Sequence, residues 1–112
     1  MAKTLEGVVE KIEEGALKGQ LLATMRSGEV EVTFDLIRDV MNFKKGEKLR
    51  IHITEEKPKD LDRFDFCGHG YLVNEESQTG MTLFSIWGIL FKFTPPIGLQ
   101  ADRKYYLCIE KA

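Results

Sequence analysis

The 112-residue sequence has no long apolar run and no excess of basic charge. No stretch approaches the roughly twenty apolar residues that a membrane-spanning helix needs, and residues 1–4 lead into charged sequence without the apolar core of a signal peptide. The formal net charge of −2 argues against a protein that binds nucleic acid over its whole surface, since such proteins are usually distinctly basic. We therefore expect a cytoplasmic protein that binds a basic or mixed-charge protein partner, with no membrane association and no sequence-specific contact with nucleic acid.

Cysteine and histidine are also scarce, with two residues of each. Cys67, Cys108, His52 and His69 together have the chemistry of a zinc site, but no Cys-x-x-Cys or His-x-x-x-His pair is present at ligand spacing. Cys67 and His69 share one strand face, yet side chains two residues apart point in parallel, and no carboxylate lies beside them to orient the imidazole. The sequence therefore predicts no metal site, no cofactor and no catalytic residue. It also predicts reduced thiols, as is usual in a cytoplasmic protein.

Alternating apolar and polar residues predict strands through most of the chain. The alternation is cleanest in residues 29–35, where three apolar side chains would face inward and the residues between them would face water. Residues 17–26 and 48–55 follow the same pattern. Ser27-Gly28 favours a tight hairpin turn, so segments 17–26 and 29–35 should pair antiparallel.

Residues 5–14 have an apolar spacing that fits a helix as well as a strand. We favour a strand, because Gly7 beside the β-branched pair Val8-Val9 would allow a bulge that shifts the alternation by one residue. The segment is then expected to pair with the other early strands.

The segment 36–43 is the only one predicted to form a helix. Asp35 can cap its N-terminus, and Lys44-Lys45-Gly46 supplies a cationic last turn and a glycine stop. Three strands, a short helix and further strands is the element order of an OB-like barrel. We therefore predict an all-β fold, an OB-like antiparallel barrel over residues 1–112 as a single domain, with one short helix between the third and fourth strands. The apolar stripe of this helix would consist of Leu36, Ile37, Val40, Met41 and Phe43.

The last third of the sequence contains three further strand-like runs, residues 64–73, 81–93 and 104–111. The middle run has apolar residues on both faces, whereas a barrel strand exposed to water should have only one apolar face. Either this strand is covered on both sides by its own domain, or one face is covered by another protein. We favour the second alternative, because aromatic residues concentrate at the cores of protein interfaces. One face has Phe84, Ile86 and Leu90, and the other has Leu83, Trp87, Ile89, Phe91 and Phe93.

Two motifs in these runs are specific. An aromatic-x-aromatic-x-Gly pattern ends at Gly68, and residues 85–93 read Ser-Ile-Trp-Gly-Ile-Leu-Phe-Lys-Phe. Together with residues 105–109, they resemble in order and spacing the C-terminal strands of subunit 8 of multisubunit RNA polymerases, whose archaeal form is designated G. Trp87 stands where that family often has the first of two glycines, and Lys92 stands where it often has arginine.

The resemblance implies a non-catalytic structural and assembly subunit of DNA-directed RNA polymerase. In that family an OB-like barrel docks on the largest subunit, which implies the largest subunit and the rest of the complex as partners. The alternative is a freestanding OB-type module for single-stranded nucleic acid, but such a module needs exposed aromatics on its early strands, which here have few. We expect Trp87 and Phe91 to be anchors on one face of the docking strand. The candidate partner-binding residues are Trp87, Gly88, Ile89, Phe91, Lys92 and Phe93.

Overall fold

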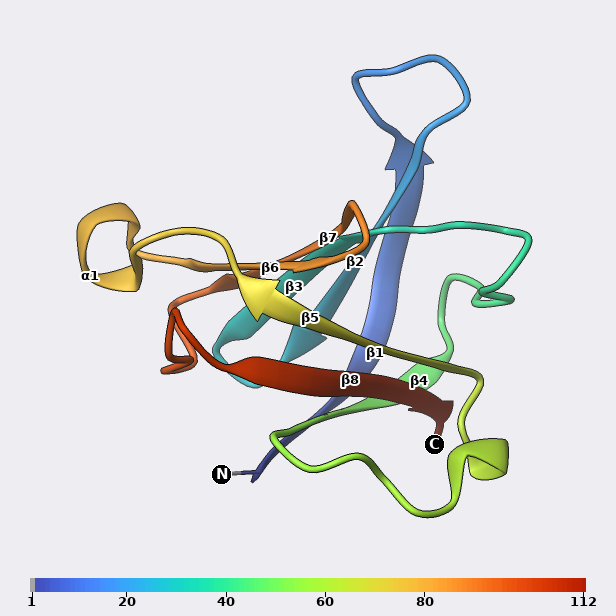
Figure 1. Ribbon diagram of the computed structural model, residues 1–112. Helices are drawn as coiled ribbons and strands as arrows, with labels where there is room; N and C mark the ends of the chain where they lie inside the picture. The colour runs from blue at the N-terminus through green and yellow to red at the C-terminus, as the bar shows by residue number, and fades with distance from the viewer. Residues whose placement is uncertain (1) are drawn as a thin grey trace.

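Segments with one buried apolar face form eight strands in the computed structural model, which describes residues 2–112, and these strands close into an antiparallel barrel (Figure 1). The order around the barrel is β1-β2-β3-β7-β6-β5-β8-β4. The predicted all-β, OB-like barrel is therefore confirmed. The strands are β1 (Ala2–Glu14), β2 (Leu21–Ser27), β3 (Val30–Asp35), β4 (Lys48–Thr54), β5 (Phe66–Leu72), β6 (Thr82–Ile86), β7 (Ile89–Thr94) and β8 (Lys104–Lys111).

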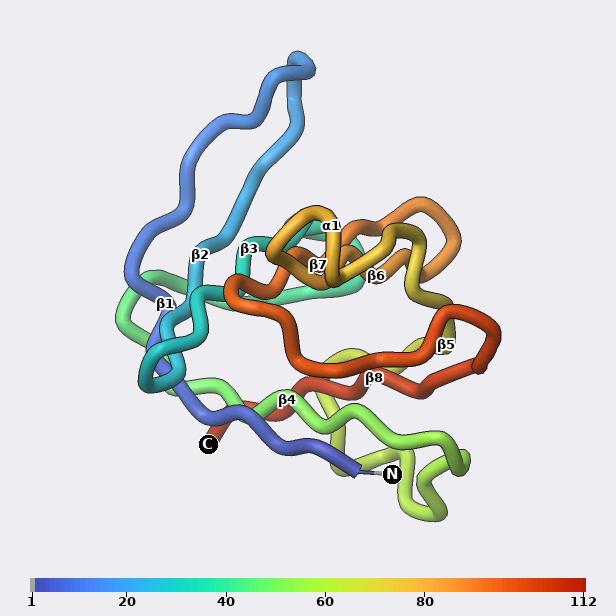
Figure 2. Tube along the Cα trace, turned by 90° about the vertical axis from the view of Figure 1, so that its left-hand side faces the viewer, coloured from blue at the N-terminus to red at the C-terminus, as the bar shows by residue number. Residues whose placement is uncertain are grey.

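The first strand, β1, takes part in two halves of the barrel. Its residues up to Val8 pair with β4, and its residues from Val8 onward pair with β2, forming a hairpin that projects from the barrel (Figure 2). The predicted strand and its bulge are confirmed, although the register shift falls between Val9 and Lys11, after the predicted Gly7-Val8-Val9. Gly7 has another role. A Cβ at this position would lie 2.1 Å from the carbonyl oxygen of Arg26, so only glycine lets β2 approach this closely.

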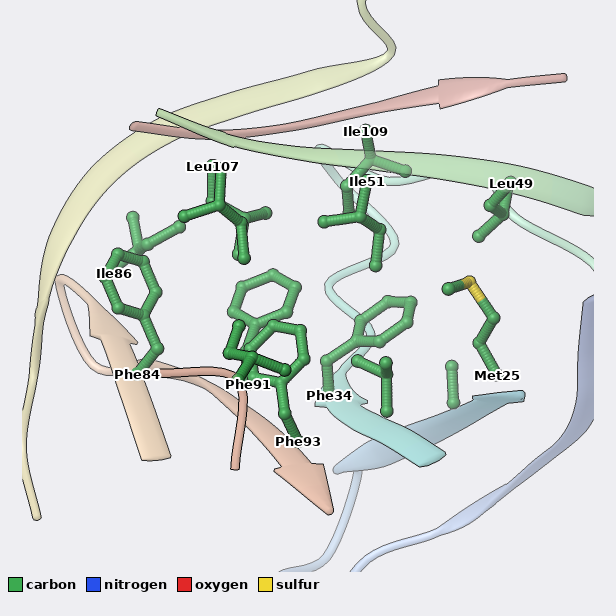
Figure 3. Packing of buried hydrophobic residues seen from close by; sticks show 14 of the residues in the cluster. Met25, Phe34, Leu49, Ile51, Phe84, Ile86, Phe91, Phe93, Leu107 and Ile109 are labelled. Carbon is green, nitrogen blue, oxygen red and sulfur yellow. The ribbon is translucent and has the colours of Figure 1, made fainter. Parts of the chain in front are cut away.

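The barrel interior is filled by the inward-facing side chains that alternation predicted. The apolar residues of β3 and β4 are nearly all buried, and Phe34 stacks on Phe91 with ring centroids 5.2 Å apart (Figure 3). Burying each such side chain stabilises the fold by roughly 1.5–3 kcal/mol. The first and the last strand both contribute, since Val9 of β1 and Leu107 and Ile109 of β8 lie in the same cluster.

The predicted helix over residues 36–43 is wrong. The only helices among residues 2–112 are the 3-10 turn η1 (Leu61–Arg63) and the short α1 (Glu76–Thr79). Asp35 does not cap a helix, because its carboxylate accepts hydrogen bonds from the Gln20 amide (3.0 Å) and from the backbone N–H of Leu90 (2.9 Å). A two-turn helix is marginal by itself, and here tertiary contacts decide the conformation. The segment forms a turn that packs Leu36, Met41 and Phe43 against the core.

The predicted two-faced strand over residues 81–93 is also different in the structure. Trp87 and Gly88 form a turn, so the run is a hairpin of β6 and β7 in which Phe84 pairs with Phe91. A two-residue turn reverses the chain and resets the alternation. Phe84 and Ile86, expected on one face of a single strand, and Phe91 and Phe93, expected on the other, therefore point into one core, whereas Trp87 and Leu90 are exposed.

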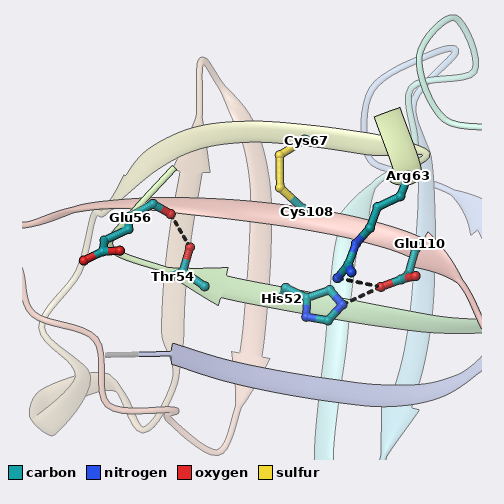
Figure 4. The surroundings of a disulfide bond; sticks show 7 residues. All are labelled: His52, Thr54, Glu56, Arg63, Cys67, Cys108 and Glu110. Carbon is teal, nitrogen blue, oxygen red and sulfur yellow. Dashed lines mark hydrogen bonds and ion pairs between the residues drawn. A yellow bond between two sulfur atoms is a disulfide. The ribbon is translucent and has the colours of Figure 1, made fainter. Parts of the chain in front are cut away.

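The prediction of reduced cysteines is contradicted as well. Cys67 of β5 lies directly opposite Cys108 of β8, and the two are joined by a disulfide (Figure 4). They are 41 residues apart in sequence, and their juxtaposition depends on the register of two strands that alternation alone does not align.

No helix among residues 2–112 is long and apolar enough to cross a membrane.

Candidate docking surface

The turn between β6 and β7 holds a tryptophan in an unfavourable conformation. Trp87 has φ 52° and Gly88 has φ 92°, as in a hairpin turn that usually uses Asn-Gly. A bulky residue in this left-handed region costs of order 1–3 kcal/mol. The Trp87 side chain regains little of this cost by burial in its own chain, because the residue is 85% exposed. The structure therefore presents a large aromatic ring to solvent at a local energetic cost.

The position of this turn depends on a close approach between β5 and β6. A Cβ on Gly70 would lie 1.9 Å from the carbonyl oxygen of Ser85, so glycine is needed where the two strands meet. Tyr71 then pairs with Ser85, and the Trp87 ring comes to lie edge-on to His69, with centroids 6.0 Å apart. The glycine thus brings the Trp87 turn onto the outer face of β5.

A groove of about 420 Å³, which we call the Trp87 groove, opens on this outer face. Besides Trp87, it exposes two large side chains of β5 and the segment after it, Tyr71 (48% exposed) and Val73 (52%). Large apolar side chains that are exposed next to one another often mark a site where another molecule binds. The groove is lined by His69, Gly70, Tyr71, Val73, Ser85 and Trp87.

A second groove, of about 290 Å³, adjoins the first and shares His69 with it. We call it the Lys57 groove. It forms where the loop after β4, including η1, passes beside the outer face of β5 and β8. Lys104 of β8 pairs with Tyr71 of the Trp87 groove, and its Nζ lies 5.3 Å from the centroid of the Tyr106 ring, where the two grooves meet. The groove is lined by Lys57, Leu61, Cys67, Gly68, His69 and Tyr106.

The outer face of β1, β4 and β8 is of another kind, because its charged groups bind one another. Glu6 accepts hydrogen bonds from Arg50 (2.8 and 3.0 Å) and lies 3.2 Å from Lys48, and these contacts, the Arg50 hydrogen bond first, hold the pKa of its carboxyl below the ordinary 4.5. Glu110 lies 2.6 Å from Nε2 of His52, with Arg63 beside it (Figure 4). Within residues 2–112, no three His, Cys, Asp or Glu side chains are grouped as metal ligands.

Comparison with known proteins assigns the family. The family model RpbG, described as the DNA-directed RNA polymerase subunit designated G, matches residues 2–112. The chain belongs to this RpbG family. It is 31% identical over 114 residues to DNA-directed RNA polymerase subunit Rpo8 of Sulfolobus acidocaldarius, covering 92% of this chain and 93% of that protein. It is 32% identical over 117 residues to the Rpo8 of Saccharolobus shibatae, covering 92% of this chain and 88% of the relative. The Rpo8 of Saccharolobus solfataricus is 29% identical, with the same coverage.

The family resemblance seen in the sequence falls on the elements that build the Trp87 groove, but its residues have different fates. Trp87 and Gly88 form the exposed turn, and Lys92 is exposed on β7. Ile89 is half-buried against the core, whereas Phe91 and Phe93 are fully buried within it. The expected face that carries both Trp87 and Phe91 is therefore absent. Those two side chains lie on opposite sides of the barrel wall.

Three residues of the surface were missed by sequence reasoning: His69, Tyr71 and Val73. The signal was present, because they alternate with Gly68, Gly70 and Leu72 and so share the outward face of β5. What the sequence could not show was that the Trp87 turn folds back onto this face.

Proposed function

We propose that this chain is a non-catalytic structural subunit of a cytoplasmic DNA-directed RNA polymerase, docked on the largest subunit and assembled with the rest of the complex. Membership of the RpbG family supports the polymerase. The Trp87 turn supports docking, because a conformationally costly, exposed aromatic ring is compensated when a partner buries it. Burial of such a side chain gives roughly 1.5–3 kcal/mol, which is enough to offset the backbone cost.

The exposed Trp87 is the observation that carries this proposal. Tryptophan is enriched among the few residues that dominate binding energy at interfaces. It lies in a groove with Tyr71 and Val73, so a partner side chain inserted there would contact apolar groups on several sides. Of the predicted partner-binding residues, Trp87, Gly88 and Lys92 remain candidates for direct contact, and Ile89, Phe91 and Phe93 support the turn from below.

The test is reconstitution with RNA polymerase assembled from its other subunits. The wild-type chain should co-elute with this polymerase in a one-to-one ratio and should bind the isolated largest subunit. Trp87→Gly should weaken the affinity by about 30-fold, equivalent to about 2 kcal/mol. Leu17→Ala is the matched control, because Leu17 is also a strongly exposed apolar residue but lies at the far tip of the β1–β2 hairpin.

Failure of the wild-type chain to bind the polymerase would overturn the proposal. The alternative, a module for single-stranded nucleic acid, is tested in parallel by titrating the chain with a single-stranded oligonucleotide. The exposed aromatic residues of the chain lie on the late elements β5 to β7. Binding of the chain to the oligonucleotide, and not to the polymerase, would favour the nucleic-acid module.

A further inference from the structure

We propose that the Trp87 groove and the Lys57 groove form one channel, which receives a single extended segment of the polymerase with an apolar side chain at the Trp87 end and a carboxylate at the lysine end. This inference rests on the proposed function and names the kind of segment that the subunit binds.

The two ends of the channel differ in chemistry. At one end, Trp87, Tyr71 and Val73 are exposed and apolar in their contact surfaces. At the other end, Lys57 lines the groove. Lys104 lies between the two ends, because it pairs with Tyr71 of the Trp87 groove and directs its Nζ over the Tyr106 ring of the Lys57 groove. A segment that binds both ends must therefore be apolar at one point and charged at another.

The sign of that charge follows from what surrounds the lysines. The whole chain has 18 acidic and 16 basic residues, and most of the ion pairs within residues 2–112 join neighbouring strands. Among the described residues, however, no Asp or Glu lines either groove, and neither Lys57 nor Lys104 forms an ion pair. Cations without a partner in their own chain complement an acidic segment.

The two grooves adjoin at His69, which lines both of them. Its ring contacts Trp87 on one side and Tyr106 on the other, with centroids 6.0 and 5.8 Å away. The outward face of β5 from Cys67 to Val73 spans six residue steps, or about 20 Å at 3.3 Å per residue. An extended segment of about six residues therefore fits along it.

The first test uses charge, with polymerase that lacks this subunit as the probe. Lys57→Glu and Lys104→Glu should each weaken binding by about tenfold, mainly through the association rate. The double variant Lys57→Gln/Lys104→Gln should also flatten the salt dependence of the affinity. Lys18→Glu is the matched control, since Lys18 is exposed on the β1–β2 hairpin and lines neither groove. Unchanged or tighter binding after either charge reversal would overturn the inference.

The second test asks whether one segment occupies both grooves. A photo-crosslinking residue is placed at Val73, in the Trp87 groove, and separately at Leu61, in the Lys57 groove; both positions are exposed. Both crosslinks should map within about ten residues of one polymerase subunit, in a stretch that contains Asp or Glu. Crosslinks to two separate segments would refute the single channel while leaving the proposed function intact, because the wild-type chain would still bind the polymerase.

Discussion

The outer face of β1 and β4 and the outer face of β5 and β6 belong to the same barrel wall but are stabilised in opposite ways. On the first face, Glu6 of β1 forms ion pairs with Lys48 and Arg50 of β4, so few charged groups remain free to pair with another protein. On the second, Trp87 is mostly exposed and Tyr71 is about half exposed. The comparison shows that the charged groups of the first face are paired within the chain, whereas the aromatic groups of the second, the proposed docking face, leave apolar surface exposed.

The barrel core lies beneath both faces, and removing Phe91 should produce the largest effect. Phe91→Ala is expected to lower the free energy of unfolding by about 3–5 kcal/mol, because the ring is fully buried and stacks on Phe34. Urea unfolding followed by circular dichroism measures this loss. If the variant instead keeps its stability and loses only polymerase binding, Phe91 belongs to the docking face and not to the core.

A somewhat smaller loss should follow from closing the approach between β5 and β6. Gly70→Ala places a Cβ in steric clash with the carbonyl oxygen of Ser85, and we expect a loss of about 3 kcal/mol in unfolding free energy. Val73→Ala, on the exposed side of the same groove, is the control and should leave the urea midpoint nearly unchanged. An equally stable Gly70→Ala variant would show that the strands can separate without cost.

The Trp87 turn should respond in the opposite direction. Trp87→Gly relieves the left-handed backbone and should raise the free energy of unfolding of the isolated chain by about 1 kcal/mol relative to Trp87→Ala, which keeps the Cβ. Both variants lose the indole ring, so the difference between their free energies of unfolding reports the backbone conformation alone. Equal urea midpoints for the two variants would mean that the turn stores no strain.

The smallest effect belongs to the ion-paired face. Because the pKa of Glu6 is lowered in the folded chain, its contribution to stability is present above pH 4.5 and disappears as the pH falls through the lower folded-state value. Glu6→Gln should therefore reduce stability slightly at pH 7 and have less effect in strong acid. Thermal melts from pH 7 to pH 2, compared with wild type, test this, and an effect that grows on acidification would contradict it.

Sequence reasoning succeeded where a local pattern of residues decides the structure. It failed where contacts between residues distant in the sequence decide it. Alternation identified β3 and β4 and their inward residues, because one buried face leaves a period of two. It failed at residues 36–43, where a hydrogen bond from the Leu36 N–H to the Leu21 carbonyl and burial of Phe43 override helical spacing. It failed again at Trp87-Gly88, because a turn that contains tryptophan lacks the usual turn residues.

The place of β8 in the barrel has a consequence for how the protein is made. This strand comes last in the sequence, yet it lies between β4 and β5, and it contributes Leu107 and Ile109 to the interior. While the ribosome is still translating the segments before residue 104, β4 and β5 each have an edge with no neighbour. Such edges invite pairing with other nascent chains. Closure of the barrel must therefore wait until β8 has left the exit tunnel, and a message truncated before residue 104 would yield a chain prone to aggregate rather than a smaller folded barrel.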